Sequence, residues 1–296
     1  MEFPVIDSHH HVWMKKDLDW LNGELQPRIF GDYTAIKKDY SIDEYIDDVI
    51  PYDVVKSVYI QCNWPEDKCE EEALYIDECF NASGWPSAFI GFCDLLNPKA
   101  NNMLEKLLAY PLTRGIRMQL HCHKNKDYSF ASRDNIMEDK IFNKNLEFLA
   151  KNQLVFELQI FENQVDQAIA LANRFPEINF ILQHAGMPHD DTKDGIEKWL
   201  NFMKKLAPIS NIYIKLSGLG TFIHKNDTSH IKFIVESVLS IFSSNRCLFG
   251  SNFPIEKIWC NYGELINSYK DATKDLKLID KKNIFYNTAK KLYRLG

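Results

Sequence analysis

Short apolar runs alternate with longer amphipathic stretches along the whole of this 296-residue chain. The amphipathic stretches have helical periodicity and lie at residues 41–50, 68–82, 102–109, 138–152, 163–174, 194–206, 229–242, 262–273 and 280–293. The apolar runs are rich in β-branched and aromatic residues and predict strands at residues 3–8, 55–62, 88–94, 115–120, 154–160, 178–184, 211–217 and 246–251. Such alternation is typical of parallel sheets, and eight strands predict an α/β fold, a closed (β/α)₈ TIM barrel.

The length of the chain allows either two domains or one barrel. No linker rich in Pro, Gly or Ser and no run of charge divides it, so we expect residues 1–296 to form a single domain. A doubly wound open sheet is the alternative arrangement of alternating strands and helices. No G-x-G-x-x-G or Walker sequence follows a predicted strand, so the usual nucleotide-binding signals of that fold are absent.

The charge and the cysteine content narrow the classes of function. The net charge of −6 is mild and the acidic residues are dispersed, which argues against binding to nucleic acid or to a membrane surface. No stretch resembles a transmembrane span or a signal peptide, and seven cysteines at irregular spacing favour free thiols in a reducing compartment. We therefore expect a cytoplasmic protein that acts on a small molecule, and assembly into a homo-oligomer stays open.

Histidines stand at the ends of two predicted strands. The first strand runs into His9, His10 and His11, and because residues two apart project from the same side, His9 and His11 face one way and His10 the other. His184 ends the sixth run and, in a closed parallel sheet, meets the first pair at the carboxyl ends of the strands. The cluster indicates a metal or catalytic site, with His10 as a structural residue. A tag remnant and a core histidine are the alternative interpretations of the run and of His184.

Polar residues also gather at the carboxyl ends of the other predicted strands. Alternate positions place on one face Gln61, Asn63, Asp94, Arg117, Gln119, His121, Glu157, Gln159, Lys215, Ser217 and Asn252. Strands buried on both faces should be almost wholly apolar, so each inward polar group costs desolvation unless it has a partner. That cost, repeated at one end of most strands, predicts the active site of a barrel enzyme. For any single one of these polar residues, a structural role is as open as a role in the active site. Glu157, for example, could form an internal ion pair with Arg117.

The segments VIDSHHHVW, GIRMQL, FILQHAGMP, YIKLSGLGTF, RCLFGSNFP and NTAKKLYRL together resemble the amidohydrolase-2 family, a branch of the amidohydrolase superfamily that includes lactonases. The resemblance runs from about Val5 to the C-terminus and implies a (β/α)₈ barrel hydrolase. By this resemblance His9 and His11 match the first-strand H-x-H, and His184 matches the sixth-strand histidine. Arg117 matches an arginine that can bind a substrate carboxylate.

Two departures from the family pattern bear on the chemistry that the resemblance implies. Most members carry an aspartate at the eighth-strand position, as metal ligand and base, whereas this chain has Asn252, and an amide is no base near neutral pH. The fifth-strand histidine is replaced by Glu157 and Gln159, which argues against a site for two metals. We expect at most one divalent ion, Zn²⁺, held by the three histidines with Glu157 or Asn252. Some lactonases of the family work without metal, so a metal-independent route is equally open.

The expected function is hydrolysis of a small, carboxylated lactone or related ester. Hydrolysis needs a polarised carbonyl, an activated water and a cation for the anionic end of the substrate. The catalytic candidates are His184, Glu157 and Asn252. The candidates for substrate binding are Arg117, Gln159, Lys215, Gln61 and Asn63. Aromatic residues in the predicted loops that are candidates to wall a planar ligand are Trp20, Trp64 and Phe222.

Two other functions stay open. Non-oxidative decarboxylation is known in the same superfamily branch, and its product, carbon dioxide, distinguishes it from ring opening. A barrel that binds a small acid without turnover is the second. Ligand-induced stabilisation in the absence of turnover would identify such a binding protein.

Overall fold

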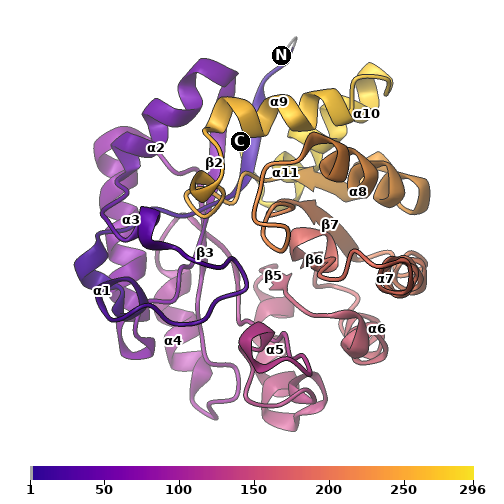
Figure 1. Cartoon of the computed structure of the whole chain (residues 1–296). Helices are drawn as coiled ribbons and strands as arrows, with labels where there is room; N and C mark the ends of the chain where they lie inside the picture. The colour runs from indigo at the N-terminus through magenta and orange to yellow at the C-terminus, as the bar shows by residue number, and fades with distance from the viewer. Residues whose placement is uncertain (1–2) are drawn as a thin grey trace.

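The computed structural model describes residues 3–296. One parallel sheet follows the order of the chain and consists of β1 Val5–His10, β2 Val54–Ile60, β3 Ala88–Gly91, β4 Thr113–Ile116, β5 Val155–Leu158, β6 Phe180–Leu182, β7 Ile212–Leu216 and β8 Cys247–Phe249. The sheet closes between its first and last strands, where Ser8 Oγ donates to the backbone oxygen of Phe249 at 2.6 Å. The backbone N–H of His11 also donates to the backbone oxygen of Phe253 at 2.7 Å. The predicted (β/α)₈ barrel is confirmed (Figure 1).

Helices surround the barrel (Figure 1). They are α2 Ile42–Val49, α3 Cys69–Ser83, α4 Ala100–Leu108, α5 Lys140–Lys151, α6 Val165–Arg174, α7 Lys193–Leu206, α8 Thr228–Ile241 and α9 Tyr262–Ala272. A short helix, α1 Asp19–Asn22, lies in the long connection after β1. The predicted last helix is divided into α10 Leu278–Lys282, a π-helical turn at Asn283–Asn287, and α11 Thr288–Leu292. Each predicted helix therefore has a counterpart near its expected place.

Side-chain caps explain where several helices begin. Ser41, Asp139 and Asn261 each accept a hydrogen bond from a backbone N–H in the first turn of the helix that follows, which satisfies donors that the helix cannot pair itself. Asn261 forms a full capping box with Glu264. Ser41 caps α2 with a single hydrogen bond, which its Oγ accepts from the backbone N–H of Glu44 at 3.2 Å.

The strands end earlier than their apolar runs predict. The fourth run extends to residue 120, but β4 ends at Ile116, and the sixth extends to His184, but β6 ends at Leu182. Beyond these points the chain leaves the sheet, and Arg117 and His184 line the pocket at the open end of the barrel. Arg117, Gln159 and His184 therefore stand just after strands, where loops of a barrel carry its functional groups.

The core has two parts. The larger hydrophobic cluster lies between the sheet and the helices. In the smaller one, inward residues of the strands such as Ile60 and Ile181 pack with Leu292 and Tyr293. The C-terminal segment closes the amino-terminal end of the barrel, since Arg114 at the start of β4 donates to the backbone oxygen of Tyr293 at 2.8 Å. The opposite, carboxyl end of the barrel holds the pocket described below.

The cysteines and the helices bear on two further expectations, free thiols and the lack of a membrane span. All seven cysteines are free thiols, as their irregular spacing predicts. Within residues 3–296, no helix combines the length and the apolar character that a membrane crossing requires.

Candidate active site

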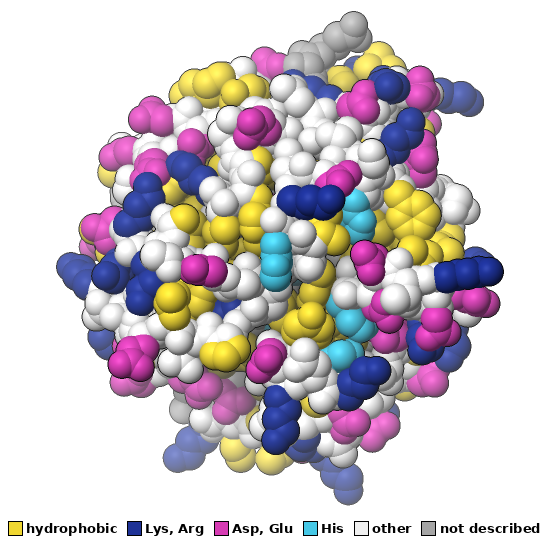
Figure 2. Space-filling model, in the orientation of Figure 1, with side chains coloured by type: hydrophobic (Ala, Val, Ile, Leu, Met, Phe, Trp, Pro, Cys, Tyr) yellow, Lys and Arg dark blue, Asp and Glu magenta, His cyan; other side chains and the backbone are white. Residues whose placement is uncertain are grey.

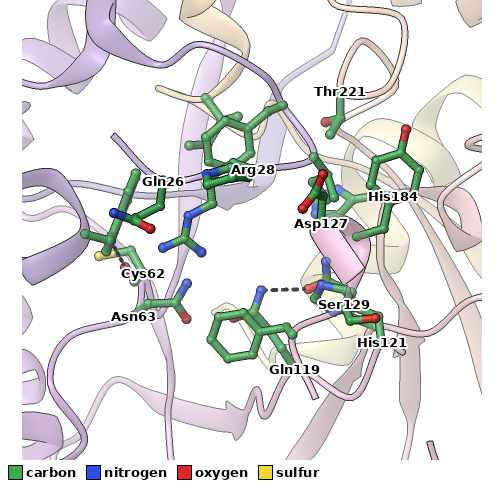
Figure 3. A pocket seen from close by; sticks show the side chains of 18 of the residues that line it. Gln26, Arg28, Cys62, Asn63, Gln119, His121, Asp127, Ser129, His184 and Thr221 are labelled. Carbon is green, nitrogen blue, oxygen red and sulfur yellow. Dashed lines mark hydrogen bonds between the residues drawn. The ribbon is translucent and has the colours of Figure 1, made fainter. Parts of the chain in front are cut away.

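A pocket of about 290 Å³ opens at the carboxyl end of the barrel. The space-filling view of this face shows a hollow near its centre (Figure 2). Most of the pocket wall comes from the connections after β1 and β4, and the rest comes from the ends of other strands. Its lining includes His11, Trp13, Trp20, Arg28, Phe30, Asn63, Arg117, Gln119, His121, Asp127, Tyr128, Ser129, Gln159, His184, Thr221, Asn252 and Ile255 (Figure 3).

The three histidines expected to meet do so. The ring centroid of His9 lies 5.1 Å from that of His11 and 4.8 Å from that of His184. His11 and His184 line the pocket, while His9 lies fully buried beneath them. His10 points the other way and stacks on Tyr45 of α2 with ring centroids 3.8 Å apart. The alternation along β1 thus separates the pocket residues from a structural one.

Both pocket histidines are neutral bases held in place by hydrogen bonds. Nδ1 of His11 lies 2.7 Å from the backbone oxygen of Ile60, and because a carbonyl only accepts, Nδ1 carries the proton and Nε2 is the acceptor nitrogen of the ring. Nδ1 of His184 lies 3.0 Å from Ser217 Oγ. Burial, and then the charge of Arg117, hold the pKa of each imidazole well below its ordinary value.

His184 occupies an unusual backbone position. Its φ of 53° is in the left-handed region, which a non-glycine residue adopts only when the surroundings stabilise it. The following residue, Ala185, has a φ of 49°, so the chain turns sharply after β6. Gly218 provides the space for the imidazole, since a Cβ at that position would lie 2.5 Å from His184 Nδ1. The turn directs the imidazole into the pocket instead of along the strand.

Asn252 also has a left-handed backbone, with a φ of 59°, and its N–H donates to the backbone oxygen of His9 at 2.7 Å. Its side chain interacts with the His11 imidazole and with the carboxyl group of Glu256. Glu256 is a residue that the sequence reasoning missed. It is buried, its Oε2 has no hydrogen-bond partner, and burial raises its pKa to about 8. A carboxyl group therefore stands four residues after the position where the family carries aspartate.

Glu157 and Lys215 are not part of the pocket wall, which corrects their prediction as catalytic and substrate-binding residues. Both are fully buried, and Lys215 Nζ lies 2.7 Å from each carboxylate oxygen of Glu157. The same carboxylate accepts from Tyr293 Oη and, at 3.2 Å, from Gln183 Nε2. The alternative pairing of Glu157 with Arg117 is also replaced by this network. Both carboxylate oxygens of Glu157 are therefore engaged by protein donors outside the pocket lining.

Gln61 is a second correction, because it holds Arg117 and does not face the pocket. The guanidinium of Arg117 donates to the backbone oxygen of Gln61 and, at 3.3 Å, to Gln183 Oε1. Gln61 Oε1 accepts from the backbone N–H of Asn63 at 2.7 Å. Burial lowers the pKa of Arg117 to about 10, so it keeps its charge at neutral pH. Arg117 lines the pocket, but part of its donor capacity is used inside the protein.

Of the other predicted residues, some line the pocket and others lie outside it. Asn63 and Gln159 line the pocket, and Gln119 Nε2 donates to Gln159 Oε1 at 3.3 Å. Asp94 is absent from the lining. Of the three aromatic candidates only Trp20 faces the pocket, since Trp64 packs against Tyr75 of α3 and Phe222 against Tyr128.

The histidine cluster does not meet the requirements of the expected zinc site. Within residues 3–296, no group of three or more His, Cys, Asp or Glu side chains is arranged to hold a metal ion. Neither ring nitrogen of His9 has a hydrogen-bond partner, but the positive charges of Lys215 and Arg117 disfavour an added cation there. The carboxylate of Asp7 is used elsewhere, accepting from the N–H of Ser251 at 2.8 Å. The arrangement of the donors and the positive charge beside them therefore argue against the expected zinc site.

Comparisons with known proteins find matches over nearly the whole chain. A family model described as Amidohydrolase matches residues 6–295. The chain is 28% identical to an uncharacterized protein, y4mH, from Sinorhizobium fredii over 99% of both chains. It is 24% identical to an L-fucono-1,5-lactonase from Burkholderia multivorans, covering 98% of this chain and 96% of that one. A solved amidohydrolase with bound zinc, also from Burkholderia multivorans, superposes with a TM-score of 0.83 at 22% identity, over 99% of this chain and 100% of that one.

Proposed function

Because the chain belongs to the amidohydrolase family and is a hydrolase, we propose that it opens a small lactone by adding water to the ring carbonyl. The observation that carries the proposal is the pair of neutral imidazoles, His11 and His184, at the wall of a pocket with several amide donors. L-fucono-1,5-lactonases are among the relatives, which supports a lactone as the class of substrate.

His184 is the general base in this proposal. Glu157 is enclosed by its partners and Asn252 is an amide, so of the three catalytic candidates His184 is the one neutral base that lines the pocket. Its imidazole takes a proton from water as the water oxygen bonds to the carbonyl carbon. The ring C–O bond then breaks, and the imidazolium returns the proton to the departing alkoxide, which gives a hydroxy acid.

The remaining pocket residues bind and polarise the substrate. Arg117 stabilises the negative charge that develops on the carbonyl oxygen, because a cation in a water-poor site acts there without reorganisation. Asn252 and His11 position the attacking water, and Asn63 and Gln159 bind ring substituents through their amides. No step is assigned to a metal ion, because the described His, Cys, Asp and Glu side chains form no group arranged to hold one.

The proposal is tested by incubating the protein with a panel of lactones and measuring the protons that hydrolysis to the acid releases. We expect turnover by the wild-type protein and a loss of roughly 100-fold or more in kcat for His184→Asn, as for removal of a general base. His230→Asn, on α8 and outside the pocket, is the matched control and should leave kcat unchanged. Stabilisation of the protein by lactones without any turnover would instead identify a binding protein.

A further inference from the structure

Arg28 stands out among the charged residues of the pocket because no acidic side chain within residues 3–296 pairs with it. It lies in the connection between β1 and α2, lines the pocket and is partly buried. Its Nε is buried without a hydrogen-bond partner, and among residues 3–296 no carboxylate forms an ion pair with its guanidinium. A buried N–H without an acceptor costs free energy, so this donor in a pocket wall is a candidate to meet a ligand.

The guanidinium is held in place by an aromatic ring instead of an acid. Its central carbon lies 5.5 Å from the ring centroid of Trp20. That ring is itself fixed, because Trp20 Nε1 donates to the backbone oxygen of Cys62 at 2.9 Å and the ring packs edge-on against Trp13. A cation–π contact orients the guanidinium while leaving its N–H donors free.

Those free donors face the ligand space. Figure 3 shows the Arg28 guanidinium reaching toward Asn63 and Gln119, across the pocket from His184. The charge of the pocket favours an anion. Its lining contains three basic residues, Arg28, Arg117 and Lys126, and one acidic residue, Asp127. The pocket is therefore locally positive in a chain whose net charge is −6.

We propose that Arg28 binds a carboxylate on the substrate, so that the site selects anionic lactones over neutral ones. The inference rests on the proposed lactone hydrolysis and names its class of substrate. The planar guanidinium can donate two parallel hydrogen bonds to a carboxylate, whereas Arg117 already donates to Gln61 and Gln183. The anion is thus bound at the β1 connection, while Arg117 faces the carbonyl oxygen.

Asp127 offers the competing explanation, in which Arg28 pairs with it when the β4 connection moves. Asp127 is exposed, lines the same pocket and follows an equally exposed Lys126. If the two residues form such an ion pair, here called the clasp, Asp127→Asn should weaken ligand binding as much as a substitution of Arg28. If Arg28 binds the substrate, removal of this acid should leave anion binding unchanged or strengthen it.

Paired probes test the proposal. Dissociation constants and kcat/KM are measured for five- and six-membered lactones, each with its carboxylated analogue, for instance γ-butyrolactone and 5-oxotetrahydrofuran-2-carboxylate. Arg28→Gln should weaken the binding of each carboxylated analogue roughly 10- to 100-fold and leave the neutral lactone unchanged. Arg28→Lys should fall between, because it keeps the charge but loses the paired donors. Arg133→Gln, on the exposed surface, is the matched control.

The outcomes separate this inference from the proposed function. A carboxylate preference in the wild-type protein that disappears in Arg28→Gln supports the inference, even if no lactone is turned over and the hydrolase proposal fails. A preference that persists in Arg28→Gln, or a wild-type protein without any preference, overturns it. Equal losses in Arg28→Gln and Asp127→Asn overturn it in favour of the clasp.

Discussion

Lys215 and Glu157 form a fully buried ion pair in which the ammonium nitrogen lies 2.7 Å from each carboxylate oxygen. The pair joins β5 to β7 across the interior of the barrel, and Tyr293 donates to the same carboxylate from the C-terminal segment. Burial lowers the pKa of Lys215 to about 8, and the negative charge of Glu157 limits that decrease. The two residues therefore support the floor of the pocket instead of acting within it.

Removing one partner of this pair should destabilise the fold strongly. Lys215→Met leaves a buried carboxylate without its cation, and we expect a loss of about 3–5 kcal/mol in the free energy of unfolding. Urea denaturation measures it. The double variant Lys215→Met, Glu157→Gln should recover part of the loss, whereas Lys205→Met, which breaks an exposed pair with Asp166, should cost less than about 1 kcal/mol. A mild effect of Lys215→Met would contradict this role.

Glu72 should make stability depend on pH. Its carboxyl group on α3 is buried, accepts from Tyr59 and the backbone N–H of Cys62, and burial raises its pKa from 4.5 to about 7. The native state therefore binds more protons than the unfolded state between these values. Its contribution to stability is present below pH 4.5 and is lost as the pH rises through 7, by on the order of 3 kcal/mol.

Glu72→Gln should remove that component. Unfolding free energies at pH 5 and pH 8 should differ less in this variant than in the wild-type protein. Glu105→Gln, exposed on α4, serves as the control and should retain the wild-type difference. The same pH dependence in all three proteins would show that Glu72 does not titrate in this way.

The two faces of β1 should respond differently to mutation. His11→Ala removes a pocket imidazole and should lower kcat by roughly 100-fold or more with little change in circular dichroism. His10→Ala removes the stacked partner of Tyr45 and should cost about 2–4 kcal/mol of stability, with turnover retained in the folded fraction. An unfolded His11→Ala, or a folded but inactive His10→Ala, would reverse the assignment.

Asn252 should determine how well the site retains metal. We expect the wild-type protein to hold less than one zinc ion per chain, and Asn252→Asp to retain more because it adds an anionic ligand beside His11. Zinc content after dialysis against a weak chelator provides the measurement. Asn63→Asp adds the same charge elsewhere in the pocket and controls for electrostatics alone. Two zinc ions in the wild-type protein, or equal retention in the wild type and Asn252→Asp, would contradict the expectation.

Which residues face the barrel axis could be predicted from the sequence, but their depth along that axis could not. Gln159 and Glu157 are two residues apart and share a face, yet one lines the pocket and the other lies beneath it. Two residues of a strand span about 6–7 Å, so the height at which each strand ends decides which residue reaches the ligand. That height depends on the stagger of neighbouring strands, which no single segment encodes.

The sequence alone determined the eight-stranded barrel and the meeting of His9, His11 and His184, because alternation along a strand and the parallel order of the sheet follow from local patterns. The tertiary structure alone decided the partners: Glu157 meets a lysine 58 positions away, and Glu256 meets Thr221, 35 positions away. Within the described part of the chain, the fold also left Arg28 Nε buried without a hydrogen-bond partner. A charged side chain acts on a substrate only when the fold leaves it unpaired, and pairing depends on distances between segments that are remote in the chain.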